Sequence, residues 1–173
     1  FLQQLLLTLL LVVLAGLLLA GIYFGWQGHT LYQKAVADHP IAAMYDSIRS
    51  RTDFVSYEAM PKTYVQAVIA VEDRRFASHH GIDPISIGRA LLIDLKTHSL
   101  AEGGSTLTQQ LAKNELFTQE KRLARKAAEM FAALAIEKAY SKQQIFEMYA
   151  NTIYFGNGSY GIAQAAAGYF GKT

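Results

Sequence analysis

A long uncharged segment at the start of the chain constrains the fold more than any other feature. No Lys, Arg, Asp or Glu precedes Lys34, and residues 5–26 are almost entirely Leu, Val, Ala, Gly and aromatic residues. A helix of about 20 apolar residues matches the hydrocarbon thickness of a bilayer. The aromatic cluster that ends at Trp26 suits the interface between membrane and water. The sequence therefore predicts a transmembrane anchor over residues 1–27.

A cleaved signal peptide is the competing interpretation of this segment. The apolar part of a signal peptide usually has about 7–15 residues and ends at a small-residue cleavage site. The apolar run in this chain is longer, which favours an anchor that is retained. A single N-terminal anchor followed by all other residues suggests a catalytic part on the extracytoplasmic side.

The remaining sequence is long enough for one domain with a modest core. The net charge of +2 gives no argument for a nucleic acid partner, and the absence of cysteine excludes disulfides, zinc–thiolate sites and thiol nucleophiles. Residues 28–59 carry scattered charges and Pro40. We expect them to form a connector close to the membrane, followed by a catalytic domain over residues 60–173.

Signals for helix starts recur through this domain. Pro61 suits a first helical turn, and the apolar stripe that follows it ends at Glu72. The other start signals are an N-cap and proline pair at Asp83–Pro84 and two capping-box spacings, Thr106 with Gln109 and Ser141 with Gln144.

These signals predict a mainly α fold. Helices are expected over residues 84–96, 118–140, 141–152 and 162–170, while the glycine-rich stretch before the last of these must turn. No segment shows a convincing strand pattern.

Two carboxylates stand out as candidates for catalysis. Glu72 lies in a run of four ionisable residues at a predicted helix end, and Glu129 lies one helical turn beyond Arg125. Glycosyl transfer and hydrolysis commonly use two carboxylates, one to move a proton and one to stabilise charge or the leaving group. A surface ion pair is the competing interpretation of the spacing between Arg125 and Glu129.

Cationic and small residues near these carboxylates predict a binding site for a phosphate group. Residues 103–106 place backbone N–H groups and hydroxyls at a predicted helix N-terminus, which favours anions, although the spacing of a nucleotide P-loop is absent. Cationic side chains recognise phosphate or pyrophosphate. They are concentrated at Lys113, Lys121, Arg122, Arg125 and Lys126.

Three blocks, in this order, make the chain similar to the peptidoglycan glycosyltransferases of family 51. They are EDRRFASHHG at residues 72–81, GGSTLTQQLAKN at residues 103–114, and the block that begins RKAAEMF over residues 125–172. The family contains monofunctional transglycosylases and the N-terminal domains of bifunctional class A penicillin-binding proteins. The resemblance implies a lysozyme-like α domain with a head lobe and a small membrane-contacting jaw. It also implies that the C-terminal part of the domain is missing after Thr173.

The resemblance implies polymerisation of lipid II, a disaccharide-pentapeptide on undecaprenyl pyrophosphate, into β-1,4-linked glycan with inversion. Glu72 would be the general base. Glu129 would assist departure of the lipid pyrophosphate, directly or through a divalent cation (Mg²⁺ or Mn²⁺), with no cofactor tightly bound. The implied substrate-binding residues are Asp73, Arg74, Phe76, His79, Gly104, Ser105, Thr106, Gln109, Gln110, Lys113, Asn114, Arg125 and Lys126.

The implied partners are lipid II, the growing glycan chain, the lipid bilayer and other cell-wall synthesis proteins. The implied location is the extracytoplasmic face of the bacterial cytoplasmic membrane, and the inhibitor moenomycin is expected to bind. His79 and His80 have no cysteine or third histidine near them in the sequence, so we expect no protein metal site there.

Two other classes of protein compete with a polymerase. A membrane-anchored lysozyme-like hydrolase or lytic transglycosylase would cleave finished glycan and would need no phosphate-binding cations. A non-catalytic cell-wall binding module would have no reason to carry both Glu72 and Glu129. The cations and the two carboxylates together favour the polymerase.

Overall fold

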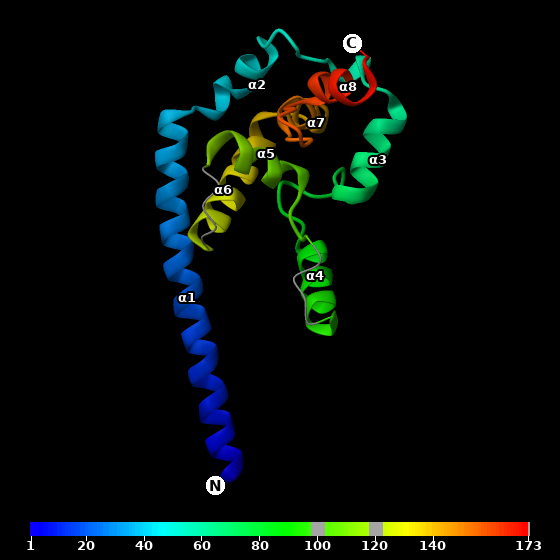
Figure 1. Ribbon diagram of the computed structural model, residues 1–173. Helices are drawn as coiled ribbons and strands as arrows, with labels where there is room; N and C mark the ends of the chain where they lie inside the picture. The colour runs from blue at the N-terminus through cyan, green and yellow to red at the C-terminus, as the bar shows by residue number, and fades with distance from the viewer. Residues whose placement is uncertain (98–102, 118–122, 173) are drawn as a thin grey trace.

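Helices dominate the structure. The computed structural model describes residues 1–97, 103–117 and 123–172. In these ranges the only extended pairing is an isolated bridge between Tyr154 and Tyr160, which confirms the predicted mainly α class. The elements (Figure 1) are α1 (Leu2–Asp38), α2 (Ile41–Arg49), the 3-10 helix η1 (Tyr57–Ala59), α3 (Lys62–Glu72), α4 (Pro84–Thr97), α5 (Leu107–Leu116), α6 (Leu123–Ala139), α7 (Lys142–Thr152) and α8 (Ile162–Phe170).

The predicted helix starts are confirmed where the structure describes them. Thr106 and Ser141 each cap a helix through a reciprocal capping box. Asp83 accepts a hydrogen bond from the backbone N–H of Ile85 at 3.0 Å, as an N-cap does. The predicted start at residue 118 lies outside the described residues, and α6 is described from Leu123 onward.

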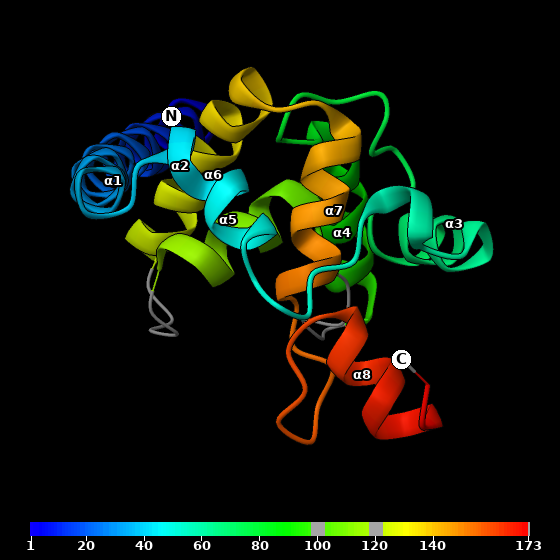
Figure 2. The same cartoon turned by 90° about the horizontal axis from the view of Figure 1, so that it is seen from above.

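Helix α7 is at the centre of the domain. All of residues 145–152 are buried, and α2, η1, α5, α6 and α8 pack around this helix (Figure 2). The Phe146 ring, 1% exposed, makes edge-on contacts with the rings of Tyr57 and Tyr64. The core therefore forms on the helix that follows the capping box at Ser141.

Residues 28–59, predicted to be a connector, contain the end of α1 and all of α2. Two polar side chains of α7 bind the irregular stretch between α2 and η1. Asn151 exchanges two hydrogen bonds of 2.8 Å with the backbone of Val55, and Glu147 accepts one of 2.7 Å from the Tyr57 N–H. These contacts are polar and span about a hundred positions, so the hydrophobic pattern of the segment gave no signal of them.

The anchor helix also packs against the domain. The upper part of α1 crosses α6, and Gly28 allows the two backbones to approach. A Cβ atom on Gly28 would lie 2.4 Å from the Cβ of Ala127. Beside this crossing, the rings of His29 and Phe131 make a T-shaped contact with centroids 5.2 Å apart.

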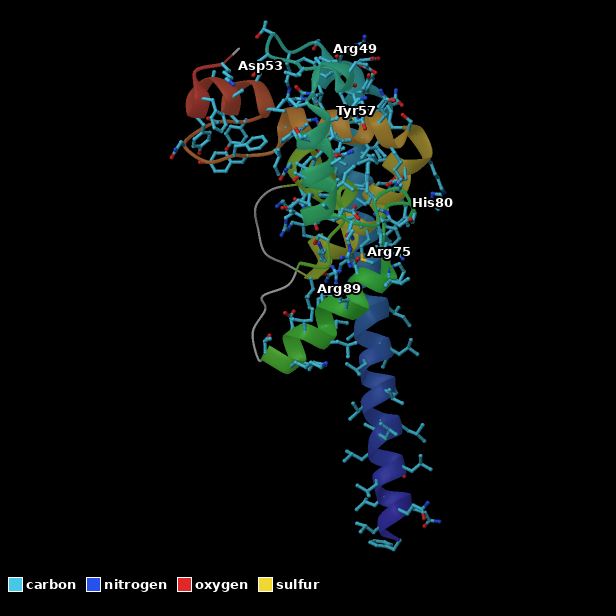
Figure 3. All side chains as sticks on the ribbon, turned by 90° about the vertical axis from the view of Figure 1, so that its right-hand side faces the viewer. Arg49, Asp53, Tyr57, Arg75, His80 and Arg89 are labelled. Carbon is cyan, nitrogen blue, oxygen red and sulfur yellow. The ribbon has the colours of Figure 1, made fainter. Side chains whose placement is uncertain are left out.

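The lower part of α1 has no partner in the described structure. By length and composition, α1 is the one described helix apolar enough to cross a membrane, and its leucines are exposed on all sides (Figure 3). Helix α4 projects in the same direction as α1 (Figure 1) and exposes Leu91, Leu92 and Leu95. Two apolar elements therefore extend from the same side of the domain.

Gly28→Val is expected to separate the upper part of α1 from α6, because the new side chain would overlap Ala127. The chain has no cysteine, so spin labels at Lys34→Cys and Lys138→Cys can report the separation of the two helices by pulsed electron paramagnetic resonance. We expect a longer or broader distance distribution. Gly25→Val is the matched control, because nothing lies within 4 Å of a Cβ there. An unchanged distribution in Gly28→Val would contradict this packing.

Candidate active site

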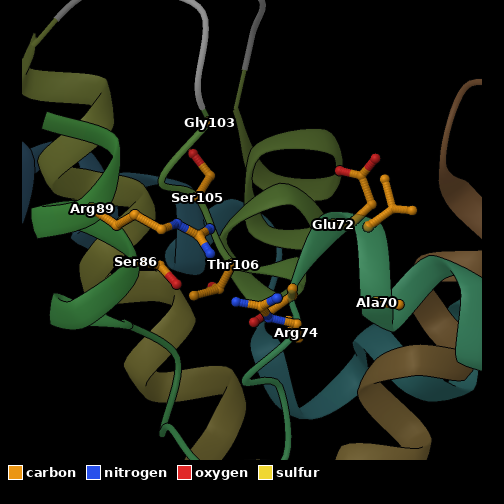
Figure 4. A pocket seen from close by; sticks show the side chains of 10 residues that line it. Ala70, Glu72, Arg74, Ser86, Arg89, Gly103, Ser105 and Thr106 are labelled. Carbon is orange, nitrogen blue, oxygen red and sulfur yellow. The ribbon is translucent and has the colours of Figure 1, made fainter. Parts of the chain in front are cut away.

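A polar cleft lies between the end of α3, helix α4 and the loop before α5. Its volume is about 300 Å³, and Figure 4 shows the side chains that line it. Glu72, the last residue of α3, borders one side, and Arg89 projects from α4 on the other. The other lining side chains that can carry charge or donate hydrogen bonds are Asp73, Arg74, Ser86, Ser105 and Thr106.

A second cavity, of about 440 Å³, opens on the other side of Glu72. Aromatic residues from several elements line it, among them Tyr64, Tyr149 and Tyr154. Glu72 belongs to the lining of both cavities. Its carboxylate therefore stands between a polar cleft and an aromatic one.

A side chain of α5 orients Glu72. The Gln110 amide donates to Glu72 Oε2 at 3.0 Å, and its carbonyl oxygen lies 3.5 Å from the Tyr149 hydroxyl. Burial, with the charges of Glu72 and Tyr64, raises the pKa of Tyr149, and burial raises the pKa of Tyr64 to about 12. Both phenols are therefore neutral at physiological pH, and they add no negative charge beside the carboxylate.

The buried carboxylate of Asp73 connects the two sides of the polar cleft. Its Oδ2 lies 2.9 Å from His79 Nε2 and accepts from the Leu107 N–H at 2.9 Å. The Gly81 N–H donates to His79 Nδ1 at 3.2 Å, so the hydrogen-bond pattern assigns the ring proton to Nε2. Asp73 thus fixes the end of α3, which carries Glu72, to the start of α5.

The start of α5 is held by a second buried contact. Thr106 Oγ1 donates to the Gly81 carbonyl at 2.7 Å and accepts from the Gln109 N–H at 3.1 Å. Gly81 has φ of +96°, and a Cβ there would lie 2.8 Å from the backbone of Ala133. Only glycine fits this position, because the left-handed backbone and the close approach both exclude a side chain.

The buried Glu129 forms a cluster with two cations. Its side chain is 2% exposed and lies 2.8 Å from Arg125 Nη1 and 3.0 Å from Lys126 Nζ. Lys126 Nζ also donates to Ser105 Oγ at 2.7 Å. A surface ion pair is therefore the wrong interpretation of the Arg125–Glu129 spacing. The cluster reaches the polar cleft through Ser105, which lines it.

The hydrogen bonding of this cluster is incomplete. Arg125 Nη1 and Glu129 Oε1 are buried and face each other in an ion pair of 2.8 Å. Arg125 Nε is buried with no hydrogen-bond partner among the described residues. Buried donors are nearly always satisfied in folded proteins. The guanidinium group therefore retains capacity for an anion.

The structure brings together only part of the predicted substrate-binding set. Glu72, Asp73, Arg74, Ser105 and Thr106 line the polar cleft, and Gln110 lines the aromatic cavity. The other predicted substrate-binding residues fall into three groups: Phe76, His79 and Gln109 are buried; Gly104, Lys113 and Asn114 are half-buried and line neither cavity; Arg125 and Lys126 contact Glu129. Lys121 and Arg122, the other two members of the predicted cation cluster, lie outside the described residues.

Phe76 and Gln109 have structural surroundings. Phe76, 3% exposed, belongs to the hydrophobic core, and Lys142 Nζ lies 4.5 Å from the centre of its ring. The Gln109 side chain accepts from the Thr106 N–H as part of the capping box. Neither side chain reaches the cleft, so both act on the site through the packing beneath it.

Sequence reasoning missed Arg89, Ser86 and the tyrosines of the aromatic cavity. Arg89 lies near the upper end of α4 (Figure 3) and is the one cation in an otherwise apolar stretch of that helix. A single cation among apolar helical positions was the available signal. The tyrosines gave no such signal in the sequence, because they come from segments that are far apart in the chain.

Asp83 fixes the start of α4, the helix that carries Arg89. Its fully buried carboxylate accepts from Arg75 Nε at 3.0 Å and from the Ser86 hydroxyl at 2.7 Å. Burial disfavours the charged form. The hydroxyl and backbone N–H of Ser86, the Ile85 N–H and the Arg75 charge outweigh it and hold the pKa of Asp83 below its ordinary value.

Asp83→Ala is expected to destabilise the start of α4 by about 1–2 kcal/mol, because the N-cap is lost. Faster amide hydrogen exchange in α4 would report this change. Asp83→Asn keeps a capping oxygen but loses the charge, so its effect should be smaller.

The charge contribution has a defined pH window. Because the folded-state pKa of Asp83 is lowered, its stabilisation is present above the unfolded-state pKa of about 3.9 and is lost as the pH falls towards the folded value. The wild type and Asp83→Asn should therefore converge in acid. Equal α4 exchange in the wild type and Asp83→Ala at neutral pH would contradict the role of this carboxylate.

Comparison with known proteins identifies what the chain resembles. The profile of the Transglycosylase family matches residues 38–173, a range that includes α2 and most of the predicted connector. The chain is 42% identical over 144 residues to penicillin-binding protein 1A/1B of Bacillus subtilis (strain 168), which covers 83% of this chain and 16% of that protein. It is 50% identical over 115 residues to penicillin-binding protein 1A of Vibrio cholerae, covering 66% of this chain and 14% of the relative.

A shorter relative is also similar. The chain is 43% identical over 127 residues to a monofunctional glycosyltransferase of Staphylococcus epidermidis, covering 73% of this chain and 47% of that protein. The chain thus spans less than a fifth of the two penicillin-binding proteins and about half of the monofunctional protein.

Proposed function

This chain belongs to the transglycosylase family, glycosyltransferase family 51, and from this premise we propose that it polymerises lipid II into β-1,4-linked glycan with release of undecaprenyl pyrophosphate. The observation that carries the proposal is the position of Glu72. This carboxylate stands between a cleft that contains Arg74 and Arg89 and a cavity lined by tyrosines. A reaction that joins two lipid-linked sugars needs a base between two substrates.

Glu72 acts as the general base in this proposal. It takes the proton from the 4-hydroxyl of the acceptor N-acetylglucosamine, and that oxygen attacks the anomeric carbon of the growing chain. The bond from the anomeric carbon to the pyrophosphate oxygen breaks, with inversion. Gln110 donates to Glu72 Oε2, which holds the carboxylate in one orientation and leaves Oε1 available for the proton.

The two groups of cations match the two pyrophosphates that take part. Arg74 and Arg89 line the cleft beside Glu72, where an acceptor pyrophosphate would lie. Arg125 and Lys126 surround Glu129, where they would neutralise the departing pyrophosphate while Glu129 assists its departure. The unpartnered Nε of Arg125 supports the second assignment.

A divalent cation has little protein support within the described structure. No cluster of three His, Asp or Glu side chains that could hold a metal occurs among the described residues. Mg²⁺ or Mn²⁺ would therefore be carried by the pyrophosphate oxygens, with Glu129 as the nearby carboxylate. No step of the proposed reaction is assigned to the ion.

The two apolar elements support the proposed location at a membrane surface. The exposed leucines of α1 and those of α4 lie on the same side of the domain (Figure 1). We propose that α1 spans the bacterial cytoplasmic membrane, that α4 contacts its outer surface, and that the domain lies on the extracytoplasmic side. The cleft beside α4 then meets lipid-linked substrates at the bilayer.

Glu72→Gln is expected to reduce glycan formation from labelled lipid II in detergent by about 100-fold or more, the usual contribution of a general base. Gel analysis of the labelled polymer measures the loss. Glu58→Gln is the matched control, because Glu58 is an exposed carboxylate away from both cavities. If the wild type left lipid II unchanged but degraded finished peptidoglycan, a hydrolase would replace the polymerase.

Lys126→Ala is expected to lower kcat/KM for lipid II by about 10- to 100-fold, as expected when a hydrogen bond to a charged group is lost. Lys126 contacts both Glu129 and Ser105, so its removal disrupts the anion site without touching Glu72. Lys138→Ala, an exposed lysine on the same helix, is the control. Equal kcat/KM in the two variants would remove the Glu129 cluster from the proposal.

A further inference from the structure

We propose that a groove between α1 and the α5–α6 pair binds the polyprenyl chain of the lipid pyrophosphate that the reaction releases. The inference rests on the proposed function and assigns a place to the lipid half of the product. We call this cavity of about 510 Å³ the anchor groove; its lining includes Trp26, Leu31, Lys34, Leu116, Phe117 and Arg125.

The anchor groove begins at the level expected for the membrane surface. Along α1, the lining of the groove begins at Trp26, which ends the long apolar run, and continues to Asp38. Twelve residues of α-helix rise about 18 Å. Because a tryptophan in this position marks the boundary between membrane and water, the groove leads from the bilayer surface into the domain.

The walls of the anchor groove suit a hydrocarbon chain. Leu31 and Ala35 line it from α1, and Leu116 and Phe117 line it from the end of α5. Leu31 is 36% exposed, although it lies above the predicted membrane span. An apolar chain in the groove would remove the exposed parts of Leu31 and Phe117 from water.

Two cations give the groove a preference for an anionic head group. Lys34 and Arg125 line it together with a single acidic residue, Asp38. Arg125 Nη1 is paired with Glu129, but Nε is buried without a partner among the described residues. A guanidinium group in this state is suited to a phosphate.

Arg125 also connects the anchor groove to the proposed site of departure. Its Nη1 lies 2.8 Å from Glu129, and Glu129 is linked through Lys126 to Ser105 of the polar cleft. A lipid whose phosphate binds Arg125 would thus lie beside the carboxylate that assists the leaving group. This continuity favours the lipid of the reaction over a phospholipid of the surrounding bilayer.

Photo-crosslinking in nanodiscs tests the occupant directly. A polyprenyl pyrophosphate with a diazirine in its chain is added to the intact protein, and labelled residues are identified by mass spectrometry. We expect label at Leu31 and Phe117, which excess unlabelled polyprenyl pyrophosphate removes and excess phosphatidylglycerol does not. Label in the groove from a diazirine phosphatidylglycerol alone, or polyprenyl label only elsewhere, would overturn the proposal.

Two variants of the anchor groove test its cationic and its apolar contacts with the lipid. Lys34→Gln and Leu31→Gln are each expected to reduce polyprenyl labelling about tenfold, as expected for one lost contact of this kind. Lys138→Gln and Leu134→Gln are the matched controls, because both side chains are exposed on α6 and lie outside the groove. Undiminished labelling in both groove variants would overturn the assignment.

Glycan formation is measured in the same samples. This measurement distinguishes failure of the groove assignment from failure of the proposed function on which it rests. If the wild type polymerises lipid II but the groove remains unlabelled by the polyprenyl probe, the groove assignment fails and the proposed function stands. If the groove is labelled but lipid II is not polymerised, the proposed function fails and a polyprenyl-binding groove remains.

Discussion

The buried carboxylate of Asp73 is the contact on which the site depends. It binds the His79 ring and the backbone N–H of Leu107, so it joins the end of α3 to the start of α5. An unpaired carboxylate in this place would be strongly unfavourable, and the donors must therefore be present for the domain to fold. Glu72 directly precedes Asp73, and Ser105 lies two residues before Leu107, so the same network positions the base and the loop opposite it.

Three helices contribute the side chains around Glu72. Helix α3 carries the carboxylate, α4 carries Arg89, and α5 carries the Gln110 that orients the base. Helix α6 adds the Glu129 cluster, which reaches the cleft through Ser105. The same helix packs against α1, so the membrane anchor and the proposed leaving-group site share one element.

Prediction from the sequence succeeded where the determinants are local. Capping at Thr106 and Ser141 involves residues three positions apart, and the start of α4 depends on Asp83 and its immediate neighbours. Prediction was incomplete where the residues in contact are far apart in the sequence. Nothing near Val55 in the sequence shows that Asn151 binds it.

The sequence by itself determined the helical class, the helix starts and the apolar anchor, because periodicity and capping act within a few residues. It also brought Glu72 and Glu129 to attention through their charged surroundings. Only the tertiary structure decided that Glu129 is buried beside Arg125 and Lys126, that Arg89 faces Glu72 across a cleft, and that α1 forms a groove with α5 and α6. These features depend on burial and on contacts between helices far apart in the chain, which local patterns do not encode.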